Sequence, residues 1–269
     1  MKIIFSHRNR TIFLALVGMV LAMGLVSAQS ATGTESAYDI MLKVFNRPEP
    51  VDLSAELKMT LIDSRGKERA RELKQISASF AGVDKKIMMF QSPADVRGTA
   101  FMNWSYTDSS RSDDQWIFLP ALNRVRRISS DGKGDSFMGS DFSYDDLGAR
   151  HPDKDSHKII GTEKINGESC WIIESTPKAS GESYSKTVSW ISQERTMGLK
   201  REFYDKKGVL LKVLSVLELR KIDGFLMIAH TEMKNVQKNH RTTMQFASLL
   251  INTGVKDDGF TERALMRGL

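Results

Sequence analysis

Apolar and polar side chains alternate along most of the chain from residue 51 onward. In the stretch SAELKMTLID, Leu57, Met59 and Leu61 would face one way, whereas Lys58 and Thr60 would face the other. A period of two is typical of β-strands that are buried on one face. Similar runs, separated by turn signals such as INGE and KIDG, recur at the spacing of antiparallel hairpins. The pattern predicts a mainly β (α+β) protein with about ten or eleven antiparallel strands.

Helical patterns are confined to residues 36–47, part of 136–149 and the C-terminal stretch FTERALMR. An antiparallel sheet with one apolar face must bury that face, and so little helix cannot cover so many strands laid flat. We therefore expect the sheet to be strongly curved and to form a closed or half-closed β-barrel, with the short helices plugging its mouth. The interior of such an under-filled barrel would be a cavity.

Large apolar side chains on the inward strand faces would line this cavity. Methionine recurs on the apolar faces, and it is a flexible filler that is common at surfaces adapting to varied apolar ligands. Each such side chain could equally be an ordinary core residue. The expected cavity residues are Met59, Leu61, Met102, Trp104, Phe118, Trp190, Phe203 and Met227.

The strand faces opposite the apolar ones carry charge. A membrane-spanning barrel would place these faces in lipid, where charges are costly, so the pattern argues against that alternative. The charged positions are Glu56, Lys58, Lys200, Glu202 and Lys212.

The N-terminus has the features of a secretory signal. Basic residues precede the apolar run TIFLALVGMVLAMGLVSA, which ends in small residues and predicts a signal peptide over 1–28 with cleavage near Ala28. An uncleaved anchor is the alternative. Residues 29–269 are expected to form one domain of a soluble, monomeric, exported protein. Without residues 1–28 the net charge falls from +6 to +3, which gives nucleic-acid binding little support.

Few residues suggest catalysis. The stretch DGKGDSFMGSDF lacks the acidic ligands and the glycine of a calcium loop, and no nucleophile motif is present. Asp145 and Asp146 could serve a hydrolase acting on a lipid or glycan, but adjacent acids more often cap helices or form ion pairs. The single cysteine, Cys170, lies in the apolar run CWIIE and is expected to be a buried, unreactive thiol. We expect no enzyme activity, no cofactor and no metal.

Residues 115–148 combine basic, glycine-rich, acidic and aromatic stretches. Arginine can pair bidentately with carboxylates, so the arginines are expected to latch the loop over the barrel mouth while its aromatic residues dip inward. A plug without any ligand is the alternative. The expected lid and latch residues are Arg126, Arg127, Phe137, Asp141, Phe142, Tyr144 and Asp146.

The stretch WIFLPALNRVRRISSDGKGDSFMGSDFSYDDL, preceded by VRGTAFMNW, resembles the outer membrane lipoprotein-sorting protein family of LolA-like periplasmic carriers. The resemblance extends from about Tyr38 to the C-terminus and is to a branch associated with RND- or MMPL-type exporters. It implies a half-open barrel whose cavity takes up acyl chains of lipoproteins or other lipids. The carrier would receive them from an inner-membrane transporter and pass them toward the outer membrane. An accessory or interaction module of the exporter, without lipid carrying, is the alternative.

Overall fold

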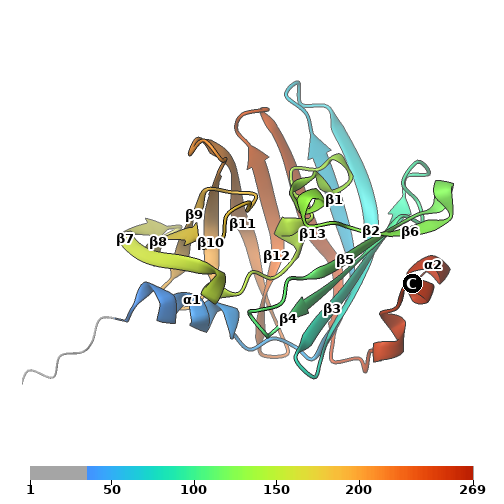
Figure 1. Cartoon of the computed structure of the whole chain (residues 1–269), viewed down its shortest axis with the longest axis horizontal. Helices are drawn as coiled ribbons and strands as arrows, with labels where there is room; N and C mark the ends of the chain where they lie inside the picture. Colours follow the sequence, from blue (N-terminus) through green and yellow to red (C-terminus); the bar gives the residue numbers. More distant parts are fainter. Residues whose placement is uncertain (1–34, 269) are drawn as a thin grey trace, which may run out of the picture. The chain divides into compact units, whose positions relative to one another are not determined.

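A computed structural model describes residues 35–268, which form one antiparallel sheet with two short α-helices (Figure 1). The prediction of a mainly β fold is confirmed, but the sheet has 13 strands rather than ten or eleven. The predicted signal peptide lies outside the described residues. Within residues 35–268, no helix has the length and apolarity needed to cross a membrane. The helices are α1 (Ala37–Phe45) and α2 (Glu262–Arg267), and the strands are β1 (Asp52–Ile62), β2 (Glu68–Phe80), β3 (Val83–Ser92), β4 (Ala100–Tyr106), β5 (Asp114–Leu119), β6 (Arg124–Arg127), β7 (Asp155–Ile165), β8 (Glu168–Pro177), β9 (Lys186–Ser192), β10 (Gly198–Tyr204), β11 (Leu210–Ile222), β12 (Phe225–Asn235) and β13 (His240–Ile251).

The sheet is open, which corrects the expected strongly curved barrel. The strand order is β6-β5-β4-β3-β2-β1-β13-β12-β11-β10-β9-β8-β7, and the edge strands β6 and β7 do not pair with each other. The first and last strands, β1 and β13, pair in the middle. Because β6 and β7 are consecutive in the chain but lie at opposite edges, the residues between them must cross one face of the sheet. This crossing segment, residues 128–154, covers the face that we call the inner face (Figure 1).

The strands that the sequence pattern missed are the ones without clean alternation. In β3, Ile87, Met88, Met89 and Phe90 are all buried, because Met88 and Phe90 face the crossing segment while Ile87 and Met89 pack with the C-terminal residues. A strand covered on both faces shows a continuous apolar run instead of a period of two. The edge strand β7 is mostly exposed and polar, so it shows no apolar face.

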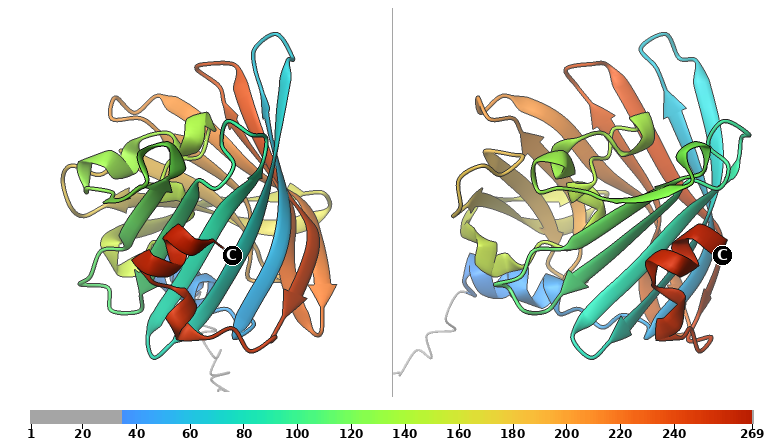
Figure 2. Two further views of the ribbon diagram at one scale, coloured as in Figure 1. Left: turned by 90° about the vertical axis from the view of Figure 1, so that its right-hand side faces the viewer. Right: turned by 45° about the vertical axis from the view of Figure 1, so that its right-hand side comes forward.

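Each helix begins after a residue whose side chain caps its N-terminus. The side chain of Ser36 accepts a hydrogen bond from the Asp39 amide, and α1 packs its apolar residues against Ile173 and Ile191 of β8 and β9. The side chain of Thr261 caps α2, which lies on the outer face of the sheet (Figure 2). The predicted helix within 136–149 is wrong, since only the short 3₁₀ turns η3 (Phe137–Gly139) and η4 (Asp145–Leu147) form there.

Asp52 at the start of β1 ties the sheet to the C-terminal tail. Its carboxylate is buried and accepts hydrogen bonds from the backbone amides of Thr253, Gly254 and Val255 and from the Thr253 hydroxyl. Burial alone would raise the pKa of Asp52, but these hydrogen bonds lower it below its ordinary value of 3.8.

Replacing Asp52 with asparagine is expected to lower the free energy of unfolding at pH 7 by about 2 kcal/mol, because hydrogen bonds to a charged acceptor are lost. A carboxyl whose pKa is depressed by folding stabilises the protein above its unfolded pKa and loses that contribution as the pH falls through the folded pKa. The difference between Asp52→Asn and the wild type should therefore shrink below pH 3.8. Urea unfolding at several pH values measures this difference in the free energy of unfolding. The exposed Asp223→Asn is the control, and a difference independent of pH would contradict the interpretation.

Candidate functional site: the inner face and its plug

The middle of the crossing segment, residues 129–149, packs into the inner face, and we call it the plug. Phe137 is fully buried, with its ring centroid 5.7 Å from that of Phe90, 5.4 Å from Phe101 and 5.6 Å from Tyr144. Phe142 is buried in the same cluster. The space over β1–β4 that the sequence led us to expect as a hollow is therefore filled by the plug's own aromatic side chains.

Cationic side chains of the sheet hold the plug through its backbone carbonyls. Arg71 on β2 donates to the carbonyl of Met138 over 2.6 Å, and Lys86 on β3 donates to that of Leu147 over 2.6 Å. Lys212 on β11 donates to the carbonyl of Asp141 over 3.1 Å. The plug has little regular structure of its own, so these bonds satisfy carbonyl groups that would otherwise be buried without partners.

Two acidic residues of the plug, Asp141 and Asp146, bind strands near the middle of the sheet. Asp146 forms a buried ion pair with Lys212 and accepts a 2.9 Å hydrogen bond from the Tyr184 hydroxyl. Asp141 accepts hydrogen bonds from His240 and Thr242 on β13 over 2.6 and 2.7 Å. We call these six residues the latch. Burial and the neighbouring Asp146 both raise the pKa of Tyr184, so its hydroxyl remains a donor.

Asp145 is adjacent to Asp146 of the latch. Burial, followed by the adjacent Asp146, raises the pKa of Asp145 above its ordinary value. Its neighbour Asp146 is already engaged by Lys212 and Tyr184. The two carboxylates therefore differ in environment, and the hydrogen bonds of Asp146 give it a structural role in holding the plug.

The predicted arginine latch is wrong. Arg127 pairs with Asp114 on the neighbouring strand β5, and Arg126 is exposed. Both arginines lie on β6 at the open edge of the sheet, whereas the plug acids Asp141 and Asp146 reach β11 and β13 near its middle. The crossing path carries these acids away from the arginines that precede them in the sequence.

Part of the inner face is apolar but not fully covered. Cross-strand partners share a face, and Met59 lies opposite Met244, Leu57 opposite Phe246, and the β1 residue Ala55 opposite Leu249. These β13 residues and their neighbours on β11 and β12 pack against the buried cluster while remaining partly exposed. We call this surface the inner strip, and it consists of Leu214, Met227, Met244, Phe246, Leu249 and Ile251.

The predicted cavity residues fall into separate clusters. Met59, Leu61, Phe203 and Met227 lie on the inner face with the plug residues Phe137, Phe142 and Tyr144. By contrast, Met102, Trp104 and Phe118 pack on the outer face with Phe260 and Leu265 of the C-terminal tail. Trp190 packs with Cys170 and Val188, and the Lys200 ammonium lies 3.8 Å from its ring centroid. One cavity cannot be lined by all eight residues, because strand alternation places them on opposite faces.

Cys170 is fully buried, as expected, and burial raises the pKa of its thiol. Sequence reasoning missed Arg71, Lys212 and Tyr184 as partners of the plug. A lysine inside the apolar run LLKVL was the available signal for Lys212, since a lysine there is buried only if it is paired.

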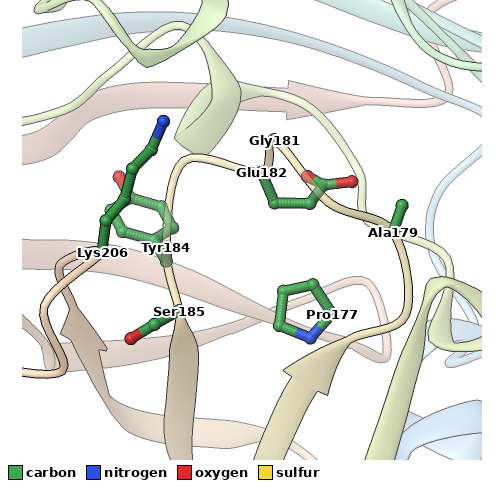
Figure 3. A pocket seen from close by; sticks show the side chains of 7 residues that line it. All are labelled: Pro177, Ala179, Gly181, Glu182, Tyr184, Ser185 and Lys206. Atoms are coloured by element: carbon green, nitrogen blue, oxygen red, sulfur yellow. The ribbon is translucent and has the colours of Figure 1, made fainter.

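A small pocket of about 220 Å³ lies beside the plug, around the β8–β9 hairpin (Figure 3). Tyr184 and Glu182 border it, and Glu182 also forms an ion pair with Arg150. The pocket is smaller than typical sites for drug-sized ligands. Its lining residues are Pro177, Ala179, Gly181, Glu182, Tyr184, Ser185 and Lys206. We therefore take the inner strip, rather than this pocket, as the candidate site for a long apolar ligand.

Comparisons with known proteins agree with the resemblance in sequence. A family model described only as an uncharacterized protein matches residues 82–267. An outer membrane lipoprotein-sorting protein domain from Vibrio parahaemolyticus has a similar structure, with a TM-score of 0.81 and 34% identity over 86% of this chain and 98% of its own. A DUF1329 family protein from Desulfovibrio piger has a TM-score of 0.81 and 31% identity over 86% of this chain and 100% of its own.

A LolA superfamily protein from Nitrosomonas europaea shares the fold, with a TM-score of 0.66 and 20% identity over 86% of this chain and 99% of its own. No curated protein matches the sequence. The two relatives above 30% identity are covered almost completely, so the similarity extends over the whole of the domain that contains the sheet and its plug. The chain belongs to the outer membrane lipoprotein-sorting protein family and has a LolA-like fold.

Proposed function

We propose that the protein is a periplasmic carrier that binds acyl chains of lipoproteins or other lipids along the inner strip. The observation that carries the proposal is the strip itself, a row of partly exposed apolar side chains on the sheet face that also holds the plug. Exposed apolar surface of this kind is typical of ligand-binding grooves. The relative from Vibrio parahaemolyticus, which is named for lipoprotein sorting, supports the same class of ligand.

Binding would require burial of apolar surface and no covalent chemistry. An acyl chain lying on Met227, Met244 and Phe246 would gain about 0.8 kcal/mol for each methylene group removed from water. Long chains would need more space than the strip offers, and displacement of the plug would expose the aromatic cluster around Phe137.

The same proposal includes the source of the cargo. The resemblance to the exporter-associated branch suggests an inner-membrane transporter of the RND or MMPL type as donor, and transfer toward the outer membrane as the next step. The alternative, an accessory module of such an exporter without lipid carrying, differs in one measurable respect. An accessory module would not need the inner strip to be apolar.

Replacing Leu249 with lysine tests the carrier proposal. Leu249 faces the inner strip, whereas the next residue, Leu250, is exposed on the opposite face. Leu249→Lys is expected to weaken binding of a fluorescent fatty acid by about tenfold or more, because a charge would replace apolar contact in the strip. Fluorescence titration measures the affinity.

Leu250→Lys adds the same charge to the same strand and is the matched control, which should bind as the wild type does. Equal binding by both variants would exclude the inner strip as the site. Absence of binding by the wild type itself would favour the accessory module.

A further inference from the structure

Arg201 is a cation on the inner face that the plug does not use. It lies on β10, directly opposite Ser189 of β9 and Leu214 of β11. The same cross-strand row continues through Met233 to Thr242, whose hydroxyl binds the plug. Arg201 therefore lies next to Leu214, at one end of the inner strip.

The guanidinium of Arg201 is only partly satisfied. Its Nε donates to the Ser189 hydroxyl over 2.9 Å. Within residues 35–268, no carboxylate forms an ion pair with it, and neither of its Nη atoms has a hydrogen-bond partner in the protein. Burial lowers the pKa of Arg201, and the nearest acids, Asp155 and Asp146, raise it only partly.

Both of those acids already have other partners. Asp155 receives two hydrogen bonds from Arg150, of 2.8 and 2.6 Å, and Asp146 is paired with Lys212. A part-buried cation without a counter-charge destabilises a protein, and buried charges are ordinarily paired. Arg201 is thus a half-buried arginine without a carboxylate partner among residues 35–268, and it lies beside an apolar strip that is also partly uncovered.

We propose that Arg201 binds the anionic head group, a carboxylate or a phosphate, of an amphiphile whose acyl chain lies on the inner strip. The inference rests on the proposed function and narrows its ligand class. The planar guanidinium matches both anions with two parallel hydrogen bonds. The Ser189 hydroxyl, which accepts from Nε, still has its own proton to donate to the same anion. An acyl chain joined to a protein by an ester or amide bond carries no charge at that bond, so free anionic lipids fit this site better than acylated proteins.

The test compares ligands that share a chain and differ in the head group. Oleate and oleyl alcohol form one pair, and oleoyl lysophosphatidate and mono-oleoylglycerol form the other, each below the concentration at which it aggregates. Calorimetric titration of the wild type is expected to show about tenfold tighter binding of the anionic member, the size of effect that charge-assisted hydrogen bonds give. The ligand pair with the larger difference in affinity shows whether the site prefers a carboxylate or a phosphate.

Arg201→Gln is expected to abolish this preference while leaving the affinity for the uncharged ligands unchanged. Arg201→Lys should keep part of the preference for anionic ligands. This result would show that the positive charge, and not a change in the fold, is responsible for the preference. Arg195→Gln, on an exposed arginine that is paired with Glu168 in the turn between β9 and β10, is the matched control and should keep the full preference.

Equal binding of charged and uncharged ligands by the wild type would overturn the inference while leaving the carrier function intact. A preference that survives in Arg201→Gln would overturn it as well. If neither kind of ligand binds, the carrier function fails and the inference fails with it. Because the wild-type comparison needs no variant, the test holds even if Arg201→Gln does not fold.

Discussion

Replacing Lys212 with methionine is expected to lower the free energy of unfolding by about 3–5 kcal/mol, the range found when one partner of a buried ion pair is removed. Only 5% of the Lys212 side chain and 3% of the Asp146 side chain are exposed, so the variant would leave a carboxylate buried without its counter-charge. Lys212 also bonds the carbonyl of Asp141, and that bond would be lost too. Urea unfolding followed by fluorescence and by circular dichroism measures the change.

Two variants distinguish loss of the buried ion pair from loss of side-chain packing as the cause of the destabilisation. Arg220→Met breaks the ion pair with Glu218, in which both side chains are 39% exposed, and it should cost less than about 1 kcal/mol. The double variant Lys212→Met/Asp146→Leu should recover most of the stability, because an apolar pair can replace a buried ion pair. If the double variant is as unstable as the single one, lost packing of Lys212 against Tyr184 and Phe203 explains the cost instead.

Local features of the fold could be predicted from the sequence because local physics determines them. Ser36 caps α1, and the tight turn after Pro120 forms with Asn123 in the left-handed conformation. The alternation in β1 correctly places Met59 and Leu61 on a buried face. Each of these features depends on a few consecutive residues, for which capping, turn preference and period are reliable guides.

The partners of the plug could not be predicted, because they depend on strand order. Asp146 is 66 residues from Lys212 and Asp141 is 99 residues from His240, whereas the arginines that we expected as partners are close in sequence. The pairing of β1 with β13 brings the distant partners together. Nothing in the alternation of β1 or β13 specifies that pairing, since every half-buried strand shows the same period.

The face of the sheet on which each set of apolar side chains lies could not be predicted either. Met102 and Trp104 alternate as correctly as Met59 and Leu61, yet they lie on the outer face beneath the C-terminal tail. A sheet with two covered faces gives two apolar sets on its central strands, and the sequence pattern does not distinguish them. The assignment follows only from the crossing segment, which must lie over one face because β6 and β7 form opposite edges.

The plug is therefore part of the hydrophobic core and also covers the inner face of the sheet, and Phe137 contributes to both roles. Phe137→Ala is expected to lower the free energy of unfolding by about 3–5 kcal/mol, the usual cost of removing a buried phenylalanine. Its ring contacts Phe90, Phe101 and Tyr144, which belong to two strands and to the plug itself, so these neighbours cannot all collapse into the space. Thermal and urea unfolding measure the loss.

The same variant links stability to binding. A cavity under the plug would join the inner strip, so Phe137→Ala should bind a fluorescent fatty acid faster than the wild type, as followed by stopped-flow fluorescence. Leu122→Ala, on a side chain that is 62% exposed, is the control and should change stability by less than about 0.5 kcal/mol and leave the binding rate unchanged. A variant that is destabilised but binds no faster would show that Phe137 is core only and that the ligand does not enter beneath the plug.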